Sequence, residues 1–108
     1  MNRSDVVAAV MAGDYGKPRL ALIIQSQPFH ELDSVTVLPL TSDLRNWPLF
    51  RITVDPNLEN GLHERSQIMV DKAATVPRRK VRGLIGKLDD HTMRQVDRAL
   101  ARFLGLSA

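Results

Sequence analysis

The chain has 108 residues, of which 44% are hydrophobic and 25% are charged, so we expect residues 1–108 to form one globular domain and exclude a disordered or fibrous chain. The absence of cysteine excludes disulfides, thiolate zinc sites and cysteine nucleophiles. The net charge of +3 is unevenly distributed. Residues 1–64 have five Lys or Arg and eight Asp or Glu, a balance of −3, whereas residues 65–108 have ten Lys or Arg and four Asp or Glu, a balance of +6. The basic second half of the chain suits either a polyanionic partner or a solvated basic face.

Six short segments rich in Val, Ile and Leu predict β-strands, because Gly, Pro, Asn and Asp separate them. They are residues 5–12, 19–26, 34–41, 48–54, 66–72 and 80–88. The third to fifth segments alternate apolar with polar positions, which indicates one buried face for each. Pro39 interrupts the third segment, as at a sheet edge or a bulge. Six strands in so short a chain favour a small, strongly curved β-barrel over an open α/β sheet.

The last segment, residues 90–104, has the spacing of an amphipathic helix. Asp89 or Asp90 can cap its start, and Gly105 can end it. Its apolar residues recur every three or four positions and are Met93, Val96, Leu100, Phe103 and Leu104. Arg94, Arg98 and Arg102 form a stripe on the other face, which either contacts phosphate or lies against solvent or a partner. We expect Phe50 and Phe103 to lie in the core.

Several chemistries are disfavoured by the residue types present. The three histidines, His30, His63 and His91, lie far apart and not at helical spacing, so we expect no metal site and no cofactor. The segment GLIGKL at 83–88 lacks the glycine spacing and the Ser or Thr of a phosphate-binding loop. The apolar runs are far shorter than the approximately 20 residues that cross a bilayer, and no leader is apparent. We therefore expect a cytoplasmic protein that does not enter the membrane.

Polar residues gather where the predicted strands begin or end. Gly13 and Gly16 allow a tight turn that presents Tyr15 and Lys17, and Arg19 follows directly. The third strand ends with Thr41, Ser42 and Asp43, and the fifth ends with Asp71 and Lys72. Turn chemistry alone explains each of these residues taken singly.

The order of these segments resembles the MazF/PemK family of type II toxin-antitoxin ribonucleases over nearly the whole chain. The matching pieces are Ser4-Asp5 at the first strand, Arg19 to Ile24 in the second, Thr41-Ser42 at the end of the third, the Asp71-Lys72 pair, and Ile85-Gly86-Lys87-Leu88. The resemblance implies a mainly β fold, an SH3-like β-barrel of the MazF/PemK/CcdB type with a C-terminal amphipathic helix.

The resemblance also implies a toxin that acts as an mRNA interferase, a sequence-specific endoribonuclease that cuts single-stranded mRNA without a metal. In this reaction the ribose 2′-OH attacks the adjacent phosphate. Arg19 would stabilise the phosphoryl charge, Thr41 would donate a hydrogen bond and Asp71 would accept the 2′-OH proton. We expect stacking of a base on Tyr15, phosphate contacts from Lys17, Lys72, Arg78 and Arg79, and further RNA contacts from Ser42 and from Gln67 at a base edge.

Homodimer formation and neutralisation by an antitoxin with an acidic, disordered tail are likewise implied by the resemblance. Two departures from the family pattern keep other functions open. No histidine lies between Arg3 and His30, where some members have a catalytic one, and Met69 stands where PemK-like members have an arginine. The alternatives are a noncatalytic CcdB-like toxin that binds and poisons DNA gyrase, and a nucleic-acid-binding regulatory barrel.

Overall fold

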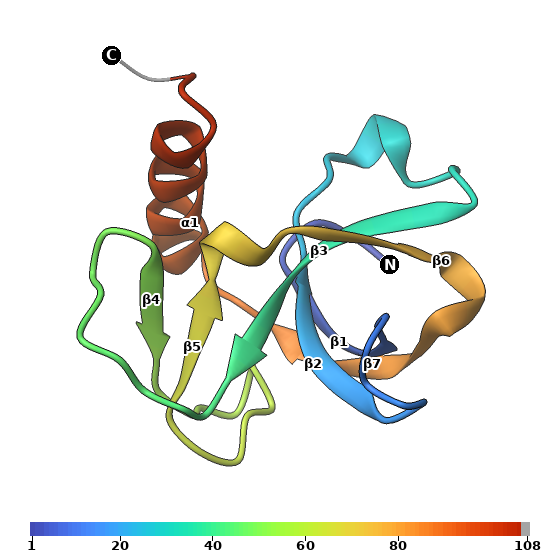
Figure 1. Cartoon of the computed structure of the whole chain (residues 1–108), viewed down its shortest axis with the longest axis horizontal. Coiled ribbons are helices and arrows are strands. Elements are labelled where there is room, and N and C mark those ends of the chain that lie inside the picture. The colour runs from blue at the N-terminus through green and yellow to red at the C-terminus, as the bar shows by residue number, and fades with distance from the viewer. Residues whose placement is uncertain (107–108) are drawn as a thin grey trace.

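Seven antiparallel strands and a C-terminal helix make up residues 1–106, the part of the chain that the computed structural model describes (Figure 1). The strands are β1 (Asp5–Val10), β2 (Pro18–Ile23), β3 (Ser34–Thr41), β4 (Arg51–Val54), β5 (Ser66–Met69), β6 (Ala74–Pro77) and β7 (Val81–Lys87). The helix α1 spans Asp90–Phe103, and three 3-10 turns lie at η1 (Gln27–Phe29), η2 (Val70–Lys72) and η3 (Arg78–Lys80).

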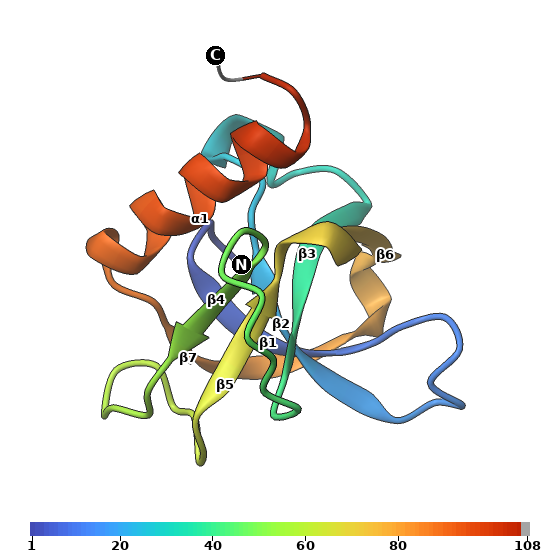
Figure 2. The same ribbon diagram turned by 60° about the vertical axis from the view of Figure 1, so that its left-hand side comes forward.

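The strands pair in the order β4-β5-β3-β2-β1-β7, and β6 pairs with β3. One edge of β3 is therefore shared: Ser34 to Val37 pair with β6, whereas Leu40 and Thr41 pair with β5. Pro39 lies at the change of partner, where its missing N–H costs no hydrogen bond on that edge. Within residues 1–106 the path does not close, so the expected barrel is a curved, partly open one (Figure 2).

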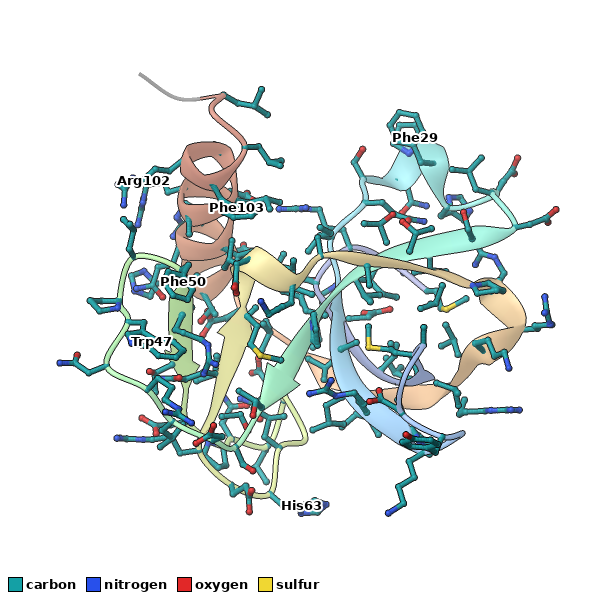
Figure 3. The ribbon with its side chains drawn as sticks, in the orientation of Figure 1. Phe29, Trp47, Phe50, His63, Arg102 and Phe103 are labelled. Atoms are coloured by element: carbon teal, nitrogen blue, oxygen red, sulfur yellow. The ribbon has the colours of Figure 1, made fainter. Side chains whose placement is uncertain are left out.

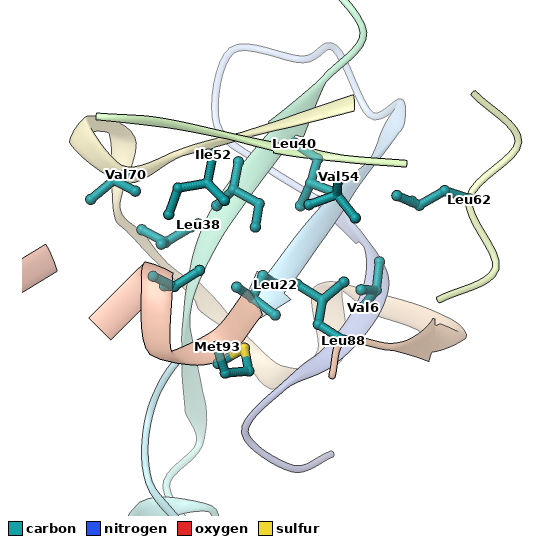
Figure 4. Packing of buried hydrophobic residues seen from close by; sticks show 12 residues of the cluster. Val6, Leu22, Leu38, Leu40, Ile52, Val54, Leu62, Val70, Leu88 and Met93 are labelled. Atoms are coloured by element: carbon teal, nitrogen blue, oxygen red, sulfur yellow. The ribbon is translucent and has the colours of Figure 1, made fainter. Parts of the chain in front are cut away.

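Two apolar clusters lie on opposite faces of the central strands. The larger one, on the side that α1 covers, includes Val6, Leu22 and Leu38 together with Met93 and Val96 of the helix (Figure 4). The other cluster takes the alternate positions of the same strands: Val7, Ala9, Ala21, Ile23, Val35 and Val37. The prediction of one buried face is confirmed for β4 but is wrong for β3 and β5, because both faces of those strands are covered.

The predicted strand limits are confirmed at β3 and need correction elsewhere. The fifth predicted strand, 66–72, ends at Met69, and η2 follows, so Asp71 and Lys72 lie in a turn rather than at a strand end. The short strand β6 was not predicted from the sequence. Its four residues contain one apolar β-branched position, Val76, which is too little to form a period.

The helix begins and ends as the sequence predicts. The Asp89 carboxylate accepts a hydrogen bond from the Thr92 backbone N–H at 2.7 Å, and this bond lowers the pKa of Asp89. Gly105 follows the helix with a φ of +73°. Phe50 packs against the larger cluster as expected, but Phe103 is exposed, because the helix extends beyond the sheet that it covers. No helix within residues 1–106 has the length and apolarity to cross a membrane.

Candidate functional site

The site is built where β2 and β3 separate. Their pairing runs from Ile23–Val37 to Ala21–Pro39 and stops there. Beyond that point β2 continues beside β1, with Arg19 opposite Ala9, whereas β3 continues beside β5, with Thr41 opposite Gln67. Arg19 and Thr41 each lie two residues beyond the last β2–β3 pair, on the two strand ends that flank the gap. The two predicted residues are thus placed on facing strand ends.

A hollow of about 370 Å³ opens on the Arg19 side of this gap. It is lined by Met11, Ala12, Arg19, Pro39, Met69, Lys72, Ala74, Thr75 and Val76. Arg19 and Lys72 are therefore two cationic groups facing one largely apolar space, and Met69 forms part of its wall. Such a hollow favours an anion, because its low polarity strengthens attraction to the guanidinium and ammonium groups.

The Arg19 guanidinium is only loosely held. Its Nε lies 3.8 Å from Oδ2 of Asp14, too far for a hydrogen bond, and the Arg19 side chain is 37% exposed. That Asp14 oxygen is buried and has no hydrogen-bond partner within residues 1–106. The charge of Asp14 orients the Arg19 side chain, while the N–H groups of the Arg19 guanidinium stay available for a bidentate contact with an oxyanion.

Thr41 faces a second hollow, also of about 370 Å³, on the other side of the gap. Leu20, Leu40, Thr41, Ser42, His63, Glu64 and Ser66 line it. The Thr41 hydroxyl oxygen accepts the Asp43 backbone N–H at 3.1 Å. With its oxygen engaged as an acceptor, the hydroxyl can still donate its hydrogen to a ligand.

His63 was not predicted as a site residue, yet it is one of the residues that line the Thr41 hollow. Figure 3 shows it at the end of the molecule away from α1. The loop that carries it, residues 55–65, is organised by the buried Asn60. The Asn60 amide accepts from the backbone N–H groups of Asn57 and Leu62 and donates to the Asp55 carbonyl, at 2.9 to 3.1 Å. The sequence signal was the turn-forming run DPNLENG, which fixes this loop but does not reveal what it faces.

Asp71 lies in η2, next to the Arg19 hollow. Its carboxylate accepts a hydrogen bond from the Lys72 ammonium at 3.0 Å, and its side chain is 24% exposed. Lys72 itself lines the hollow. The predicted acidic residue is therefore brought to the Arg19 side of the gap, paired with a lysine, while Thr41 faces the other side.

The residues predicted to bind RNA fall into two groups. Tyr15 and Lys17 project from the β1–β2 turn, where Tyr15 is fully exposed and has a φ of +52°. Ser42 and Arg79 are also exposed, and Ser42 lines the Thr41 hollow. These four side chains, with Lys72, are accessible to a ligand.

The prediction for Gln67 does not fit its placement, because this side chain is buried and fully hydrogen bonded. Its Oε1 accepts from the Arg45 backbone N–H at 3.0 Å and from Arg51 Nη1 at 2.9 Å. Its Nε2 donates to the Arg45 carbonyl at 2.9 Å and to the Thr53 hydroxyl at 3.1 Å. No donor or acceptor is left for a base edge, so Gln67 instead anchors the loop that follows Thr41.

Arg78 is likewise committed to the structure. Its guanidinium donates to the carbonyls of Leu32, at 2.8 and 2.9 Å, and of His30. These bonds attach the η1–β3 connection to η3. These bonds use Nε and Nη2, so a phosphate contact by Arg78 stays a prediction that would rely on its Nη1 group, whereas Arg79 next to it is exposed.

Comparison with known proteins agrees with this architecture. The family model described as PemK-like, MazF-like toxin of type II toxin-antitoxin system matches residues 2–104. A probable endoribonuclease MazF of Mycolicibacterium smegmatis is 43% identical over 108 residues, which is 99% of each chain. The solved structure of the Mycobacterium tuberculosis toxin MazF-mt6 is 25% identical, covers 98% of this chain and 100% of its own, and superposes with a TM-score of 0.80. A MazE-MazF structure from Deinococcus radiodurans, 18% identical over 99% of this chain and 97% of its own, shares the fold with a TM-score of 0.80.

Proposed function

The chain belongs to the PemK-like, MazF-like toxins of type II toxin-antitoxin systems, and we propose that it acts as a metal-independent endoribonuclease on single-stranded mRNA. The observation that supports this most directly is the placement of Arg19 and Thr41 on facing strand ends, with a hollow on each side. A scissile phosphate lying across the gap would contact the Arg19 guanidinium on one side and the Thr41 hydroxyl on the other.

The proposed reaction is an internal transesterification. The ribose 2′-oxygen bonds to phosphorus, the bond from phosphorus to the 5′-oxygen breaks, and the products have a 2′,3′-cyclic phosphate and a free 5′-hydroxyl. Arg19 stabilises the charge that develops on the phosphoryl oxygens, and the Thr41 hydroxyl donates to one of them. A preorganised donor of this kind contributes about 10² to 10³ in rate.

Two protons must also move. Asp71, on the Arg19 side, accepts the proton of the 2′-hydroxyl, while the Lys72 ammonium keeps its carboxylate in place. We assign the proton that reaches the departing 5′-oxygen to His63, which lines the Thr41 hollow. A protonated imidazole is a general acid, and positioned acid and base groups contribute roughly 10² to 10⁴ each.

RNA on either side of the cut would be held by the exposed residues around the gap. Tyr15 offers a fully exposed ring for stacking, and Lys17, Lys72 and Arg79 offer cations for phosphates. Ser42, beside Thr41, offers a small hydroxyl. The expected partners are a second copy of the chain and a cognate antitoxin with an acidic tail, and the expected compartment is the cytoplasm.

The test is cleavage of a long RNA by the purified, antitoxin-free protein in EDTA. Fragments with cyclic phosphate and 5′-hydroxyl ends are the expected products. RNA that stays intact while gyrase supercoiling is inhibited would overturn the proposal in favour of a CcdB-like poison. RNA that is bound but stays intact, with gyrase unaffected, would point to a noncatalytic binding barrel.

A further inference from the structure

Arg51 of β4 forms a hydrogen bond with the loop that follows Thr41, but it lines neither hollow of the proposed cleavage site. We propose that Arg51 is a positioning residue for RNA cleavage: it holds the Asp43 peptide so that the Asp43 backbone N–H fixes the Thr41 hydroxyl. This inference rests on the proposed function, in which that hydroxyl donates to a phosphoryl oxygen. In this role Arg51 contacts neither the RNA nor the reacting atoms.

The direction of the Thr41 hydroxyl depends on its contact with the loop after β3. The hydroxyl oxygen accepts the Asp43 backbone N–H at 3.1 Å, as in turns where a threonine side chain bonds the backbone two residues ahead. This bond selects the side-chain rotamer of Thr41, because another rotamer would turn the oxygen away from the N–H. It also engages the oxygen as an acceptor and leaves the hydrogen for a ligand. The position of the Asp43 peptide therefore decides where the Thr41 donor points.

Arg51 holds the backbone of Asp43 in place. Asp43 forms no backbone–backbone hydrogen bond within residues 1–106, and its carbonyl instead accepts from Arg51 Nη1 at 3.0 Å. On either side of it the chain is attached to β5, since Thr41 pairs with Gln67 and the Arg45 backbone bonds the Gln67 side chain. Without Arg51, the backbone between these two anchors would be tethered only at its ends.

The Arg51 guanidinium is itself held in one orientation. Its Nη1 also donates to Oε1 of Gln67 at 2.9 Å, and its carbon atom lies 5.1 Å from the centroid of the Trp47 ring. Trp47 stacks in turn on Phe50, which packs against the larger apolar cluster. Stacking on an aromatic face restricts the plane of a guanidinium, so Nη1 stays aimed at its two acceptors. A chain of contacts therefore runs from the core, through Arg51, to the Thr41 hydroxyl.

The Nε atom of Arg51 is buried and has no hydrogen-bond partner within residues 1–106. A buried donor without an acceptor lowers stability, so this side chain is not placed for the fullest set of hydrogen bonds. It is placed for the two bonds that Nη1 makes, one of which holds Asp43. A local loss of this kind is typical of residues that serve a functional site.

Arg45 has surroundings similar to those of Arg51 but does not bond the Asp43 carbonyl. Its guanidinium carbon lies 5.4 Å from the centroid of the same Trp47 ring, and its Nε and Nη2 donate to Oδ2 of Asp43 at 3.1 and 2.9 Å. These bonds reach the Asp43 side chain rather than its backbone, and the two side chains are 50% and 64% exposed. An exposed ion pair contributes little to stability, so we expect Arg45 to fix the Asp43 peptide far less than Arg51 does.

The experiment is a double-mutant cycle on the single-turnover rate of RNA cleavage at saturating protein. Arg51→Met keeps an apolar stem but removes the donors, and it should cut RNA about tenfold more slowly with nearly unchanged RNA affinity. Thr41→Val removes the hydroxyl, and in that background Arg51→Met should change the rate by less than about twofold, because the group that Arg51 positions is gone. In the Arg19→Lys background the loss should persist. Arg45→Met is the matched control and should cut RNA at the rate of the unmodified protein.

Thermal unfolding of each variant sets the assay temperature below every midpoint, so the rates refer to folded protein. If Arg51→Met does not fold, Arg51→Lys takes its place in the cycle. The lysine keeps the charge but loses the planar group that stacks on Trp47, and its loss of about fivefold should again disappear in Thr41→Val.

Equal slowing by Arg51→Met with and without the Thr41 hydroxyl would overturn the proposal, because the effect would then reach the site by another route. So would cleavage by Arg51→Met at the unmodified rate, or an Arg45→Met variant that is slowed as much as Arg51→Met. RNA that the unmodified protein leaves intact would contradict the proposed cleavage itself, and this inference with it.

Discussion

Arg19 and Gln67 are both polar residues on strands, but the structure uses them in opposite ways. Arg19 lies 3.8 Å from a single carboxylate oxygen and is partly exposed, so its donors are available to a ligand. Gln67 is buried, and all four of its hydrogen-bonding positions are taken by the protein. A loosely held cation beside a hollow suits catalysis, whereas a saturated buried amide suits anchoring.

Replacing Arg19 with lysine keeps the charge but loses the planar fork that can contact two phosphoryl oxygens. We expect Arg19→Lys to cut RNA about 10²-fold more slowly in single-turnover experiments, with nearly unchanged RNA affinity and thermal unfolding. The control is Lys17→Ala, which should weaken RNA binding by an amount that shrinks at high salt. Full activity of Arg19→Lys would remove Arg19 from the mechanism.

His63 can be tested with a substrate whose leaving group needs no proton. If His63 protonates the departing 5′-oxygen, His63→Ala should slow the cleavage of ordinary RNA by about 10²-fold in single-turnover experiments. An RNA with sulfur in place of that 5′-oxygen has a leaving group that departs without a proton, so His63→Ala should cut it nearly as fast as the unmodified protein does. His91→Ala, which changes an exposed histidine of α1, is the matched control and should leave both rates unchanged. Equal slowing of both substrates in His63→Ala would assign the proton to another group.

Gln67→Met tests the anchoring role, because methionine has a similar shape without the amide. The Arg45 backbone groups and the Arg51 guanidinium would lose their partner, and we expect the free energy of unfolding to fall by about 2 to 4 kcal/mol. Urea unfolding measures this loss. Gln27→Met, at an exposed position of η1, should change it by less than about 0.5 kcal/mol. Similar values for the two variants would contradict the anchoring role.

Among the structural elements, the loop of residues 55–65 packs directly against the backbone of β7. A Cβ atom at position 86, in place of the Gly86 hydrogen, would come within 3.0 Å of the Asn60 carbonyl carbon and oxygen, and one at Gly61 would come as close to the Ile85 oxygen. The Lys87 N–H also donates to the Glu59 carbonyl at 2.9 Å. The two glycines thus allow the close approach that holds the His63 loop in place.

Gly86→Ala should therefore separate the loop from β7, with a loss of about 1 to 3 kcal/mol in the free energy of unfolding. Gly83→Ala is the matched control on the same strand, because a Cβ atom at that position would have no neighbour within 4 Å, and it should change the value by less than about 1 kcal/mol. Thermal or urea unfolding of the pair gives the comparison. Equal stability of the two variants would show that the loop is not held by this contact.

Over the molecule as a whole, apolar side chains remain uncovered at the ends of the sheet. Leu84 of β7 is 69% exposed and Ile85 is 39% exposed, and β7 is one end of the pairing path. An exposed apolar strand at a sheet edge favours association with another chain. Together with membership of the toxin family, this favours a symmetric homodimer.

Light scattering of the purified protein at micromolar concentration tests that expectation. We expect a species of twice the 12.1 kDa chain mass. Dilution should shift the mass toward the single chain only at concentrations below the dissociation constant. A mass of 12.1 kDa throughout the micromolar range would contradict the homodimer.

Features that depend on neighbours along the chain could be predicted from the amino-acid sequence. The limits of β3, the Asp89 cap of α1 and the Gly105 stop follow from local strand propensity, side-chain capping and glycine conformation, and all three are confirmed. The short segments rich in Val, Ile and Leu predicted a mainly β chain for the same reason, and the resemblance to the MazF/PemK family implied the type of fold.

The neighbours of each residue in space could not be predicted from the sequence and are known only from the packing of the folded chain. Thr41 and His63 line the same hollow although 22 residues separate them. Gln67 forms hydrogen bonds with Arg45, also 22 residues away. Arg78 donates hydrogen bonds to carbonyls 46 and 48 residues earlier in the chain. The exposed Phe103 and the two-sided burial of β3 likewise depend on which elements cover which. Burial and polar satisfaction are properties of packed surfaces, and strand periodicity alone specifies neither the partner strand nor what covers each face.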